Sequence, residues 1–309
     1  MRPYLTILAS AAALAVLVTS FASWILDPYG IARPPAGKVL MQPNDRASKT
    51  AFLAVDCPQF NSYIVGNSRS QILQGSQFAD AEGRYYNLGA PAEEIGQSLE
   101  RLEFLFRSSC AVTALLVGES VDVLARPRPD SFTQMEHPLI TGGNPLLFYG
   151  KYFLGPQGAI AFLRSKISPS LRPMFYYPDG HMDFLWEMRG DADYTIPLCR
   201  ISGLSAQQKT DLYGRLPLYR KLASLAAQHH VKVVVWLTPL SKTRSIVLDD
   251  PDVSRYISEL RQIAGLRVLE PDRDSPLLAD FQQWHDCNHF HRAVFDQLVA
   301  PGVAKLLRE

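Results

Sequence analysis

The sequence predicts an α/β protein whose parallel sheet is wound on both sides by helices. Short β-branched or apolar runs alternate along the chain with segments whose apolar residues recur at helical spacing. The run Val112–Val117 is almost wholly apolar, which is typical of a strand covered on both faces. Such alternation favours parallel strands joined by right-handed crossovers. We therefore expect a three-layer, doubly wound parallel sheet.

Five strands and several helices make up this expected domain, which covers residues 61–309. The strands are expected at residues 62–65, 84–88, 112–117, 232–237 and 266–269. Helical periodicity is found between Pro91 and Ser108, before the fourth and fifth strands, and from near His291 onward. Between about residues 125 and 204 the chain is rich in proline, glycine and aromatics. We expect an irregular insertion there, after the third strand.

An apolar segment precedes the domain. Residues 4–26 carry no charged side chain, and about 20 apolar residues suffice to cross the hydrocarbon core of a bilayer as a helix. Arg2 stands before the segment, and Trp24 and Tyr29 suit an aromatic belt at the far interface. We expect a single transmembrane anchor with the domain on the extracytoplasmic (periplasmic) side.

A cleaved signal peptide is the alternative for residues 1–26, with Ser20 and Ala22 as the small-residue cleavage site. The mature protein would then be secreted. Residues 27–60 contain five prolines and no clear period, so we expect an extended stem between the membrane and the domain.

Charge and cysteine content narrow the class of protein. The 309 residues carry a formal net charge of +1, whereas a nucleic-acid binder needs a basic surplus. The four cysteines include no C-x-x-C pair, and no cofactor is expected. Cys57 and Cys110 precede the first and third strands, at the same end of the predicted sheet. They form either a disulfide of an exported domain or two small buried residues.

A serine follows the first strand. In the run VGNSRS, Ser68 comes directly after the strand and just before a helix, where negative charge is favoured. Serine is also a good helix N-cap, and that is the simpler interpretation. Of four G-x-S triplets, only those at Gly66 and Gly118 end an apolar strand.

A histidine and an aspartate lie near the other end of the chain. Asp286 and His289 form the only D-x-x-H in the sequence, just before the last helix. At this spacing in a helical turn the carboxylate can hold one imidazole tautomer while the other ring nitrogen faces a nucleophile. Ser68 and this pair can meet only at the carboxyl edge of the sheet. Alternatively, His289 caps the final helix.

A metal site is a further interpretation of this region. Five potential ligands stand within seven residues: His285, Asp286, Cys287, His289 and His291. The rest of the chain offers only a loose His181/Asp183 pair. Short His-rich runs often mislead, so we expect no metal.

The blocks GNSRS (66–70), NLG (87–89) and DCNH (286–289) together resemble the SGNH (GDSL-like) hydrolase superfamily, in its membrane-anchored bacterial envelope type. The resemblance covers about residues 61–125 and 230–309. It implies the strand order 2-1-3-4-5. It also implies Ser68 as nucleophile, His289 as general base and Asp286 as its orienter.

The resemblance further implies an oxyanion hole made by the backbone N–H groups of Ser68 and Gly89. The family places an asparagine after the third strand as another donor, whereas this chain has Gly118, Glu119 and Ser120 there. Ser120 could donate in its place, and an ionised Glu119 would oppose the oxyanion.

Two functions are therefore expected from the sequence. The first is a serine-dependent esterase or acyltransferase that acts on acyl esters, O-acetyl groups of an envelope polysaccharide in particular, through an acyl-serine intermediate. Transfer would require a separate membrane acyltransferase partner to supply acyl groups. The alternative is a non-catalytic SGNH-fold module that binds a glycan or scaffolds an envelope assembly.

Overall fold

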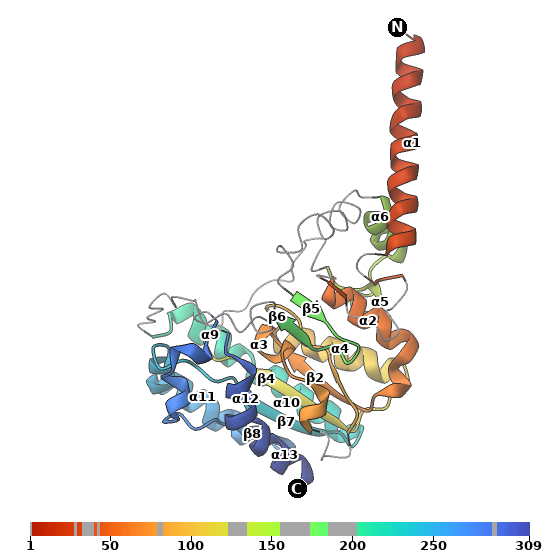
Figure 1. Cartoon of the computed structure of the whole chain (residues 1–309). Helices are drawn as coiled ribbons and strands as arrows, with labels where there is room; N and C mark the ends of the chain where they lie inside the picture. Colours follow the sequence, from red (N-terminus) through yellow and green to blue (C-terminus); the bar gives the residue numbers. More distant parts are fainter. Residues whose placement is uncertain are drawn as a thin grey trace. The chain divides into compact units, whose positions relative to one another are not determined.

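The computed structural model divides the chain into two compact units (Figure 1). The N-terminal unit comprises Met1–Val55 and Arg128–Pro178, and the sheet unit comprises Asp56–Pro127 and Asp179–Glu309. The described residues are 2–27, 30–32, 40–41, 44–78, 83–122, 135–154, 174–184, 203–285 and 289–309. Residues 128–178 of the expected insertion thus belong with the N-terminal residues, and the remainder from residue 179 belongs with the sheet unit. The two units are described separately.

The sheet unit contains a five-stranded, wholly parallel sheet. Its strands are β2 (Ser62–Gly66), β3 (Tyr85–Asn87), β4 (Ala114–Glu119), β7 (Lys232–Leu237) and β8 (Leu266–Leu269). They lie in the spatial order β3-β2-β4-β7-β8. The predicted α/β class with a parallel sheet is confirmed, and each strand lies within about two residues of its predicted position.

The strands read as apolar runs because both faces of the sheet are covered. Every residue of β2 and β4 is buried. One row across four of the five strands consists of valines alone, since Val65 pairs with Val117, Val117 with Val235, and Val235 with Val268. β-branched side chains pack well on such a pleated surface.

Helices and short turns connect these strands. They are η1 (Cys57–Gln59), α3 (Ser68–Gln71), η2 (Gly75–Phe78), α4 (Ile95–Arg107), α9 (Ala206–Gly214), α10 (Leu216–Gln228), η4 (Ser245–Asp249), α11 (Pro251–Arg261), η5 (Pro276–Leu278), η6 (Phe281–Gln283), α12 (Arg292–Leu298) and α13 (Ala300–Arg308). The short strand β6 (Met182–Phe184) also belongs to this unit. Local signals define several helix starts: Ser205 and Gln208 form a capping box on α9, and Asp250 caps α11 ahead of Pro251.

The helices of the sheet unit form two groups by contact. Helix α10 contacts α4, α9 and α11, whereas α12 and α13 contact each other. Both α10 and α13 contact β7. Helix α4 buries one face, with Leu99 and Leu102 almost fully excluded from solvent, which matches the helical periodicity of its sequence.

A disulfide joins Cys57 and Cys110, whose Cα atoms are 5.5 Å apart. Cys57 lies five residues before β2 and Cys110 four residues before β4. The bond therefore links the chain covalently at the amino-terminal ends of two neighbouring strands. The carboxyl edge of the sheet is at the other end of these strands. The disulfide alternative for this pair is therefore the one the structure contains.

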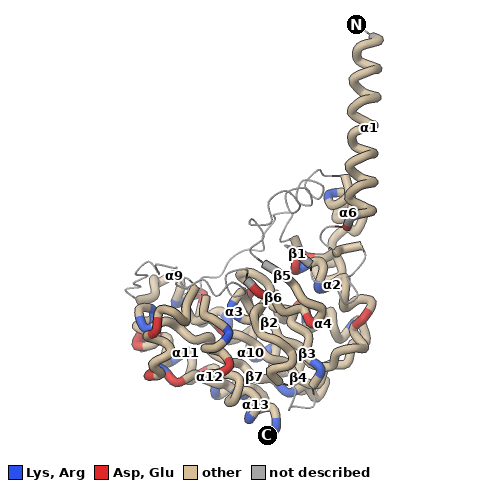
Figure 2. The backbone as a smooth tube through the Cα atoms, viewed as in Figure 1, with Lys and Arg blue, Asp and Glu red and all other residues tan. Residues whose placement is uncertain are grey.

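The N-terminal unit begins with α1 (Arg2–Leu26), a helix long and apolar enough to cross a membrane over Pro3–Ile25. Figure 2 shows no charged residue along its length beyond its start. The other elements are β1 (Leu40–Met41), α2 (Asp45–Asp56), α5 (Pro138–Thr141), α6 (Pro145–Leu154) and β5 (Met174–Tyr176), and β1 pairs antiparallel with β5.

The stem differs from the extended segment that the sequence predicts, because it contains α2. The Asn44 side chain accepts from the Ala47 N–H at the start of this helix and donates to the Met135 carbonyl, 91 residues away. Arg46 is fully buried and pairs with Glu136. These partners are distant in sequence, so local composition gives no sign of them.

We expect removal of the disulfide to destabilise the sheet unit. Replacing both cysteines (Cys57→Ser with Cys110→Ser) opens a loop of 53 residues, which lowers the free energy of unfolding by about 4 kcal/mol through unfolded-chain entropy. Urea unfolding with and without reductant measures the loss. Reductant should move the midpoint of the wild type and leave that of the double variant unchanged. An unmoved wild-type midpoint would contradict a stabilising bond.

Candidate active site

Ser68 is the first residue of α3, immediately beyond the carboxyl end of β2. Asn67 caps the helix, because its side-chain oxygen accepts from the Arg69 N–H at 3.0 Å. The N-cap interpretation of the serine itself is therefore wrong: the asparagine holds that position. Ser68 is partly exposed, whereas its neighbours Asn67 and Arg69 are buried.

Two glycines let α3 lie directly on the edge of the sheet. Gly66 and Gly118 face each other in the β2–β4 register. A Cβ on Gly66 would approach the Ser70 hydroxyl oxygen to 2.6 Å, and one on Gly118 would approach it to 2.1 Å. Gly66 also has a φ of +128°, which L side chains rarely adopt. Only glycine at both positions allows this strand-to-helix turn.

His289 meets Ser68 at this edge. The Ser68 Oγ lies 2.8 Å from the His289 Nε2, although the residues are 221 apart in sequence. His289 is held by its backbone, because the His285 N–H donates to its carbonyl and Trp284 pairs with Phe290 in an antiparallel bridge. The sequence-predicted serine and histidine are thus brought together. Asp286, the third predicted member, lies outside the described residues.

Asn87 connects the end of β3 to the far end of α3. It is fully buried, and its Nδ2 donates to the carbonyls of Ser70 at 2.7 Å and Leu73 at 2.9 Å. Its Oδ1 accepts from the Gly89 N–H at 2.9 Å. That N–H was expected to face an oxyanion, and in this structure it is bonded within the protein.

Ser120 belongs to a buried hydroxyl network behind α3. Its Oγ accepts from the Asn67 Nδ2 at 2.8 Å and lies 2.9 Å from the Thr238 Oγ1. Thr238 in turn accepts from the Arg69 guanidinium at 3.0 Å. The Ser120 hydroxyl therefore orients the helix cap, whereas the sequence suggested a donor to substrate.

A buried ion pair anchors the same network. Arg69 donates two hydrogen bonds to Asp122, at 2.7 and 2.8 Å, and Arg244 adds a contact of 2.9 Å. Burial by itself raises the pKa of the Asp122 carboxyl, but the charge and hydrogen bonds of Arg69 and the charge of Arg244 bring it below its ordinary value. The carboxylate thus stays ionised, and bidentate geometry makes the pair strong.

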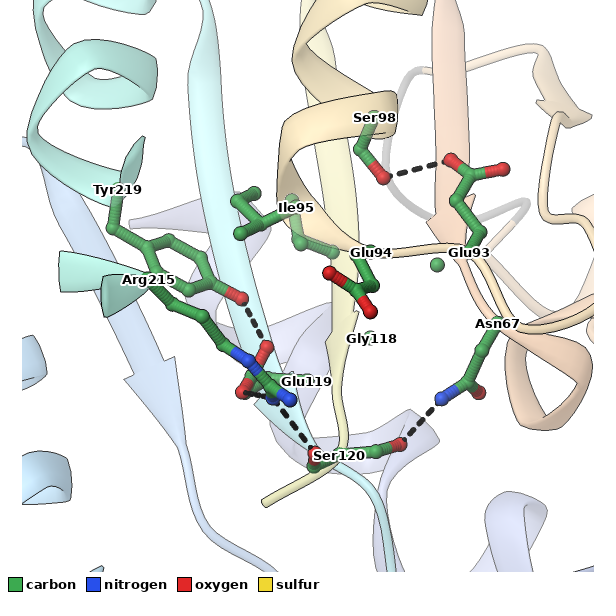
Figure 3. Close-up of a pocket in the computed structure, with 12 residues that line it drawn as sticks. Asn67, Glu93, Glu94, Ile95, Ser98, Gly118, Glu119, Ser120, Arg215 and Tyr219 are labelled. Atoms are coloured by element: carbon green, nitrogen blue, oxygen red, sulfur yellow. Dashed lines mark hydrogen bonds and ion pairs between the residues drawn. The ribbon is translucent and has the colours of Figure 1, made fainter. Parts of the chain in front are cut away.

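Glu119 faces a different set of partners (Figure 3). Its oxygens accept from the Arg215 guanidinium at 2.6 Å and the Tyr219 hydroxyl at 2.6 Å, and from Tyr256 at 3.2 Å. Burial raises the pKa of both tyrosine hydroxyls, so they remain donors. The expectation that Glu119 opposes an oxyanion is therefore weakened, because Arg215 compensates its charge.

A small pocket lies among these groups. Asn67, Glu93, Ser98, Gly118, Glu119 and Arg215 are among the residues that line it (Figure 3). Its free volume is about 20 Å³, which is room for about one water molecule. This volume is too small for a sugar ring, and several lining side chains bond to one another: Asn67 to Ser120, Ser98 to Glu93 and Arg215 to Glu119.

The histidine-rich segment is only partly described. The rings of His285 and His291 lie 3.5 Å apart between centroids. Within the described ranges, no group of three or more His, Cys, Asp or Glu side chains is arranged to hold a metal ion. Asp286 and Cys287 fall outside those ranges.

The loose His181/Asp183 pair has other principal partners. His181 is hydrogen-bonded to Asp179, and Asp183 pairs with Arg292 at the start of α12. Arg292 also donates to the Ile72 carbonyl just after α3. These contacts fix the 179–183 segment against the loop that follows the Ser68 helix.

Several residues of the site went unrecognised in the sequence. They are Asn67, Arg69, Asn87, Asp122 and Thr238. The sequence does contain a signal for these residues: each lies within a few positions of the carboxyl end of a strand, and ligands of parallel sheets bind at that edge. Which of these residues pair with one another depends on strand order.

In comparisons with known proteins, no family model, curated protein or solved structure matches this chain. The class of protein is defined by its own fold and site. It is an α/β protein with a parallel five-stranded sheet and a serine–histidine hydrogen bond at the carboxyl edge.

We expect Gly118→Ala to reduce the reactivity of Ser68 at least tenfold, because the new Cβ would lie 2.1 Å from the Ser70 Oγ and 3.0 Å from the Trp236 ring, so the packing of the Ser70 side chain under α3 must change. Overpacking of this kind also costs about 1–3 kcal/mol of stability. The labelling rate with a fluorophosphonate probe measures the effect on the serine.

Gly96→Ala is the matched control. A Cβ there would come no closer than 3.7 Å to Leu218, and alanine favours the helix α4. Its labelling rate should equal that of the wild type. Equal rates for both variants would show that close glycine packing does not position the serine.

Proposed function

We propose that this protein is a serine-dependent esterase or acyltransferase that acts on acyl esters. The observation that carries the proposal is the 2.8 Å contact between the Ser68 Oγ and the His289 Nε2. A nucleophile and base within hydrogen-bond reach, on elements far apart in sequence, are the signature of an activated serine. Ser68 also stands at the carboxyl edge, where parallel sheets bind ligands.

The chemistry follows from this geometry. The Ser68 Oγ attacks the carbonyl carbon of the ester while its proton passes to the His289 Nε2. The imidazolium then gives that proton to the leaving alcohol, and an acyl ester of Ser68 remains. Water completes hydrolysis, or a sugar hydroxyl completes transfer, with His289 as base again. We assign Asp286 the role of holding the imidazole tautomer through the other ring nitrogen.

The oxyanion hole of this proposal begins with the Ser68 N–H, which belongs to the first turn of α3 and has no intrahelical partner. The Gly89 N–H would donate to the substrate oxygen only after its hydrogen bond to the Asn87 Oδ1 is broken. Loss of one oxyanion donor lowers rates by about 10²–10³. The proposal is therefore for a slow enzyme, whether water or a sugar hydroxyl takes the acyl group.

The substrate class rests on the resemblance and on the apolar N-terminal helix. Both support an SGNH-like protein of the bacterial envelope, anchored by α1 with its sheet unit on the extracytoplasmic side. The order β3-β2-β4-β7-β8 is compatible with the 2-1-3-4-5 order of that superfamily. We propose O-acetyl groups of an envelope polysaccharide as substrate, with a membrane acyltransferase as acyl donor in the transfer reaction.

A second candidate function is glycan binding without catalysis. The engagement of both the Gly89 N–H and the Ser120 hydroxyl inside the protein favours it, because neither is presented to a substrate oxygen. In that case Ser68 would contribute a hydrogen bond to a sugar and no covalent step.

We expect a fluorophosphonate probe to label the wild-type chain at one serine and to leave Ser68→Ala unlabelled. His289→Ala should slow labelling by two orders of magnitude or more, because general-base assistance contributes about 10²–10⁴-fold. Intact mass and labelling rate, on the full chain in detergent, provide both readouts.

Ser254→Ala on α11 is the matched control, since Ser254 is exposed and its loss should change neither labelling nor stability. If the folded wild type is not labelled by the probe, the enzyme proposal is contradicted and glycan binding becomes the favoured function.

We expect Asp286→Asn to lower the labelling rate by about 10²–10⁴-fold while unfolding stays close to wild type, because the wrong imidazole tautomer faces Ser68. Asp280→Asn, which alters a short turn in the same segment, provides the comparison. If Asp286→Asn labels as fast as Asp280→Asn, the site is a serine–histidine pair without an aspartate.

A further inference from the structure

An exposed, uncharged surface lies on α5 and α6 of the N-terminal unit. Outside α1, four of the seven exposed large apolar side chains in the described residues belong to this segment: Leu139, Leu146, Leu147 and Leu154. Leu146 is 83% exposed and Leu147 is 67% exposed. Exposed apolar side chains that gather on one segment, and are not scattered singly over the surface, indicate that a membrane or a partner covers this segment.

The charge pattern of the segment indicates a lipid environment. Residues 138–150 contain no Asp, Glu, Lys or Arg, and residues 141–147 are all exposed. The first cationic side chain is the exposed Lys151, near the carboxyl end of α6. An apolar stretch followed by a lysine is typical of segments that lie in a bilayer interface.

The other face of α6 is packed and holds the helix in place. Phe148 and Tyr152 are buried in a cluster with Ile31 and Ala47. Both faces of α6 are therefore apolar: the inner face packs in a protein core, and the outer face carries the exposed leucines.

Helix α6 also contacts the end of the candidate membrane span. The rings of Trp24 and Phe153 lie 5.4 Å apart, and the Tyr152 hydroxyl donates to Asp27 at 2.6 Å. Figure 1 shows α6 beside the last turns of α1, and the two helices are in contact. Because Trp24 stands where the span ends, α6 lies at the level of the membrane surface.

We propose that α5 and α6 insert their exposed leucines into the bilayer beside α1, as a second membrane contact of the N-terminal unit. The inference rests on the proposed anchoring by α1. The occupant is the acyl-chain region of the lipid nearest the headgroups. Leu146 and Leu147 enter it, and Lys151 reaches the headgroups. The N-terminal unit is thus fixed to the membrane surface by two elements.

Depth-dependent fluorescence quenching tests this in the full chain. Cys199→Ser and Cys287→Ser leave only the Cys57–Cys110 disulfide. One further substitution per chain, Leu146→Cys, Leu147→Cys, Leu14→Cys or Val55→Cys, then provides a single thiol for an NBD label. The chains are reconstituted in phosphatidylcholine vesicles with nitroxide-labelled lipid. Leu14 reports the span, and Val55, which is 68% exposed on α2, matches the exposure of Leu147.

We expect labels at Leu146 and Leu147 to be quenched at least twofold by nitroxides placed shallow in the acyl chain, the Leu14 label by deeper ones, and the Val55 label by neither. Quenching at Leu14 without quenching at Leu146 and Leu147 would overturn the second contact and leave the anchor intact. No quenching at Leu14 would overturn the anchor itself. A blue-shifted but unquenched Leu146 label would also overturn the proposal, because a protein would then cover α6.

Discussion

The buried ion pair between Arg69 and Asp122 is the interaction on which the carboxyl edge of the sheet depends. Arg69 follows Ser68 in α3, and Asp122 follows β4, so the pair ties the serine helix to the neighbouring strand. Removing Asp122 would leave the buried Arg69 guanidinium without its counter-charge, at a cost of about 3–5 kcal/mol. Thr238, after β7, accepts from the same guanidinium and brings a third strand into the network.

This arrangement has a chemical consequence. Asn67, Ser120 and Asn87 use their polar atoms to hold α3 in place, and the Gly89 N–H is bonded to Asn87. The support of the serine is therefore strong, whereas the donors available to a developing oxyanion are few. A Ser68–His289 pair with few oxyanion donors predicts slow acyl chemistry, whether water or a sugar hydroxyl is the acceptor.

The N-terminal unit is stabilised differently from the sheet unit. Its core around Phe148 and Tyr152 is small, and buried polar contacts such as Arg46 with Glu136 complete it. Contact with a lipid bilayer would therefore stabilise this unit. The exposed apolar residues of α1 and α6 lie on neighbouring helices, so one bilayer can cover both, and the hydrophobic effect then favours the ordered unit.

The sequence by itself determined the parallel sheet, because runs such as VVVWL (233–237) are apolar throughout only when both faces are covered, and these five residues are the buried part of β7. It also selected Ser68 and His289, since strand ends and helix starts are local signals. Only the tertiary structure decided which hydrogen-bond donors remain unused at the carboxyl edge and that residues 45–56 of the stem form α2. Those outcomes depend on pairings such as Gly89 with Asn87 and Asn44 with Met135. A hydrogen bond satisfied inside the protein is set by the geometry of the assembled strands and loops, and residue type alone does not carry that information.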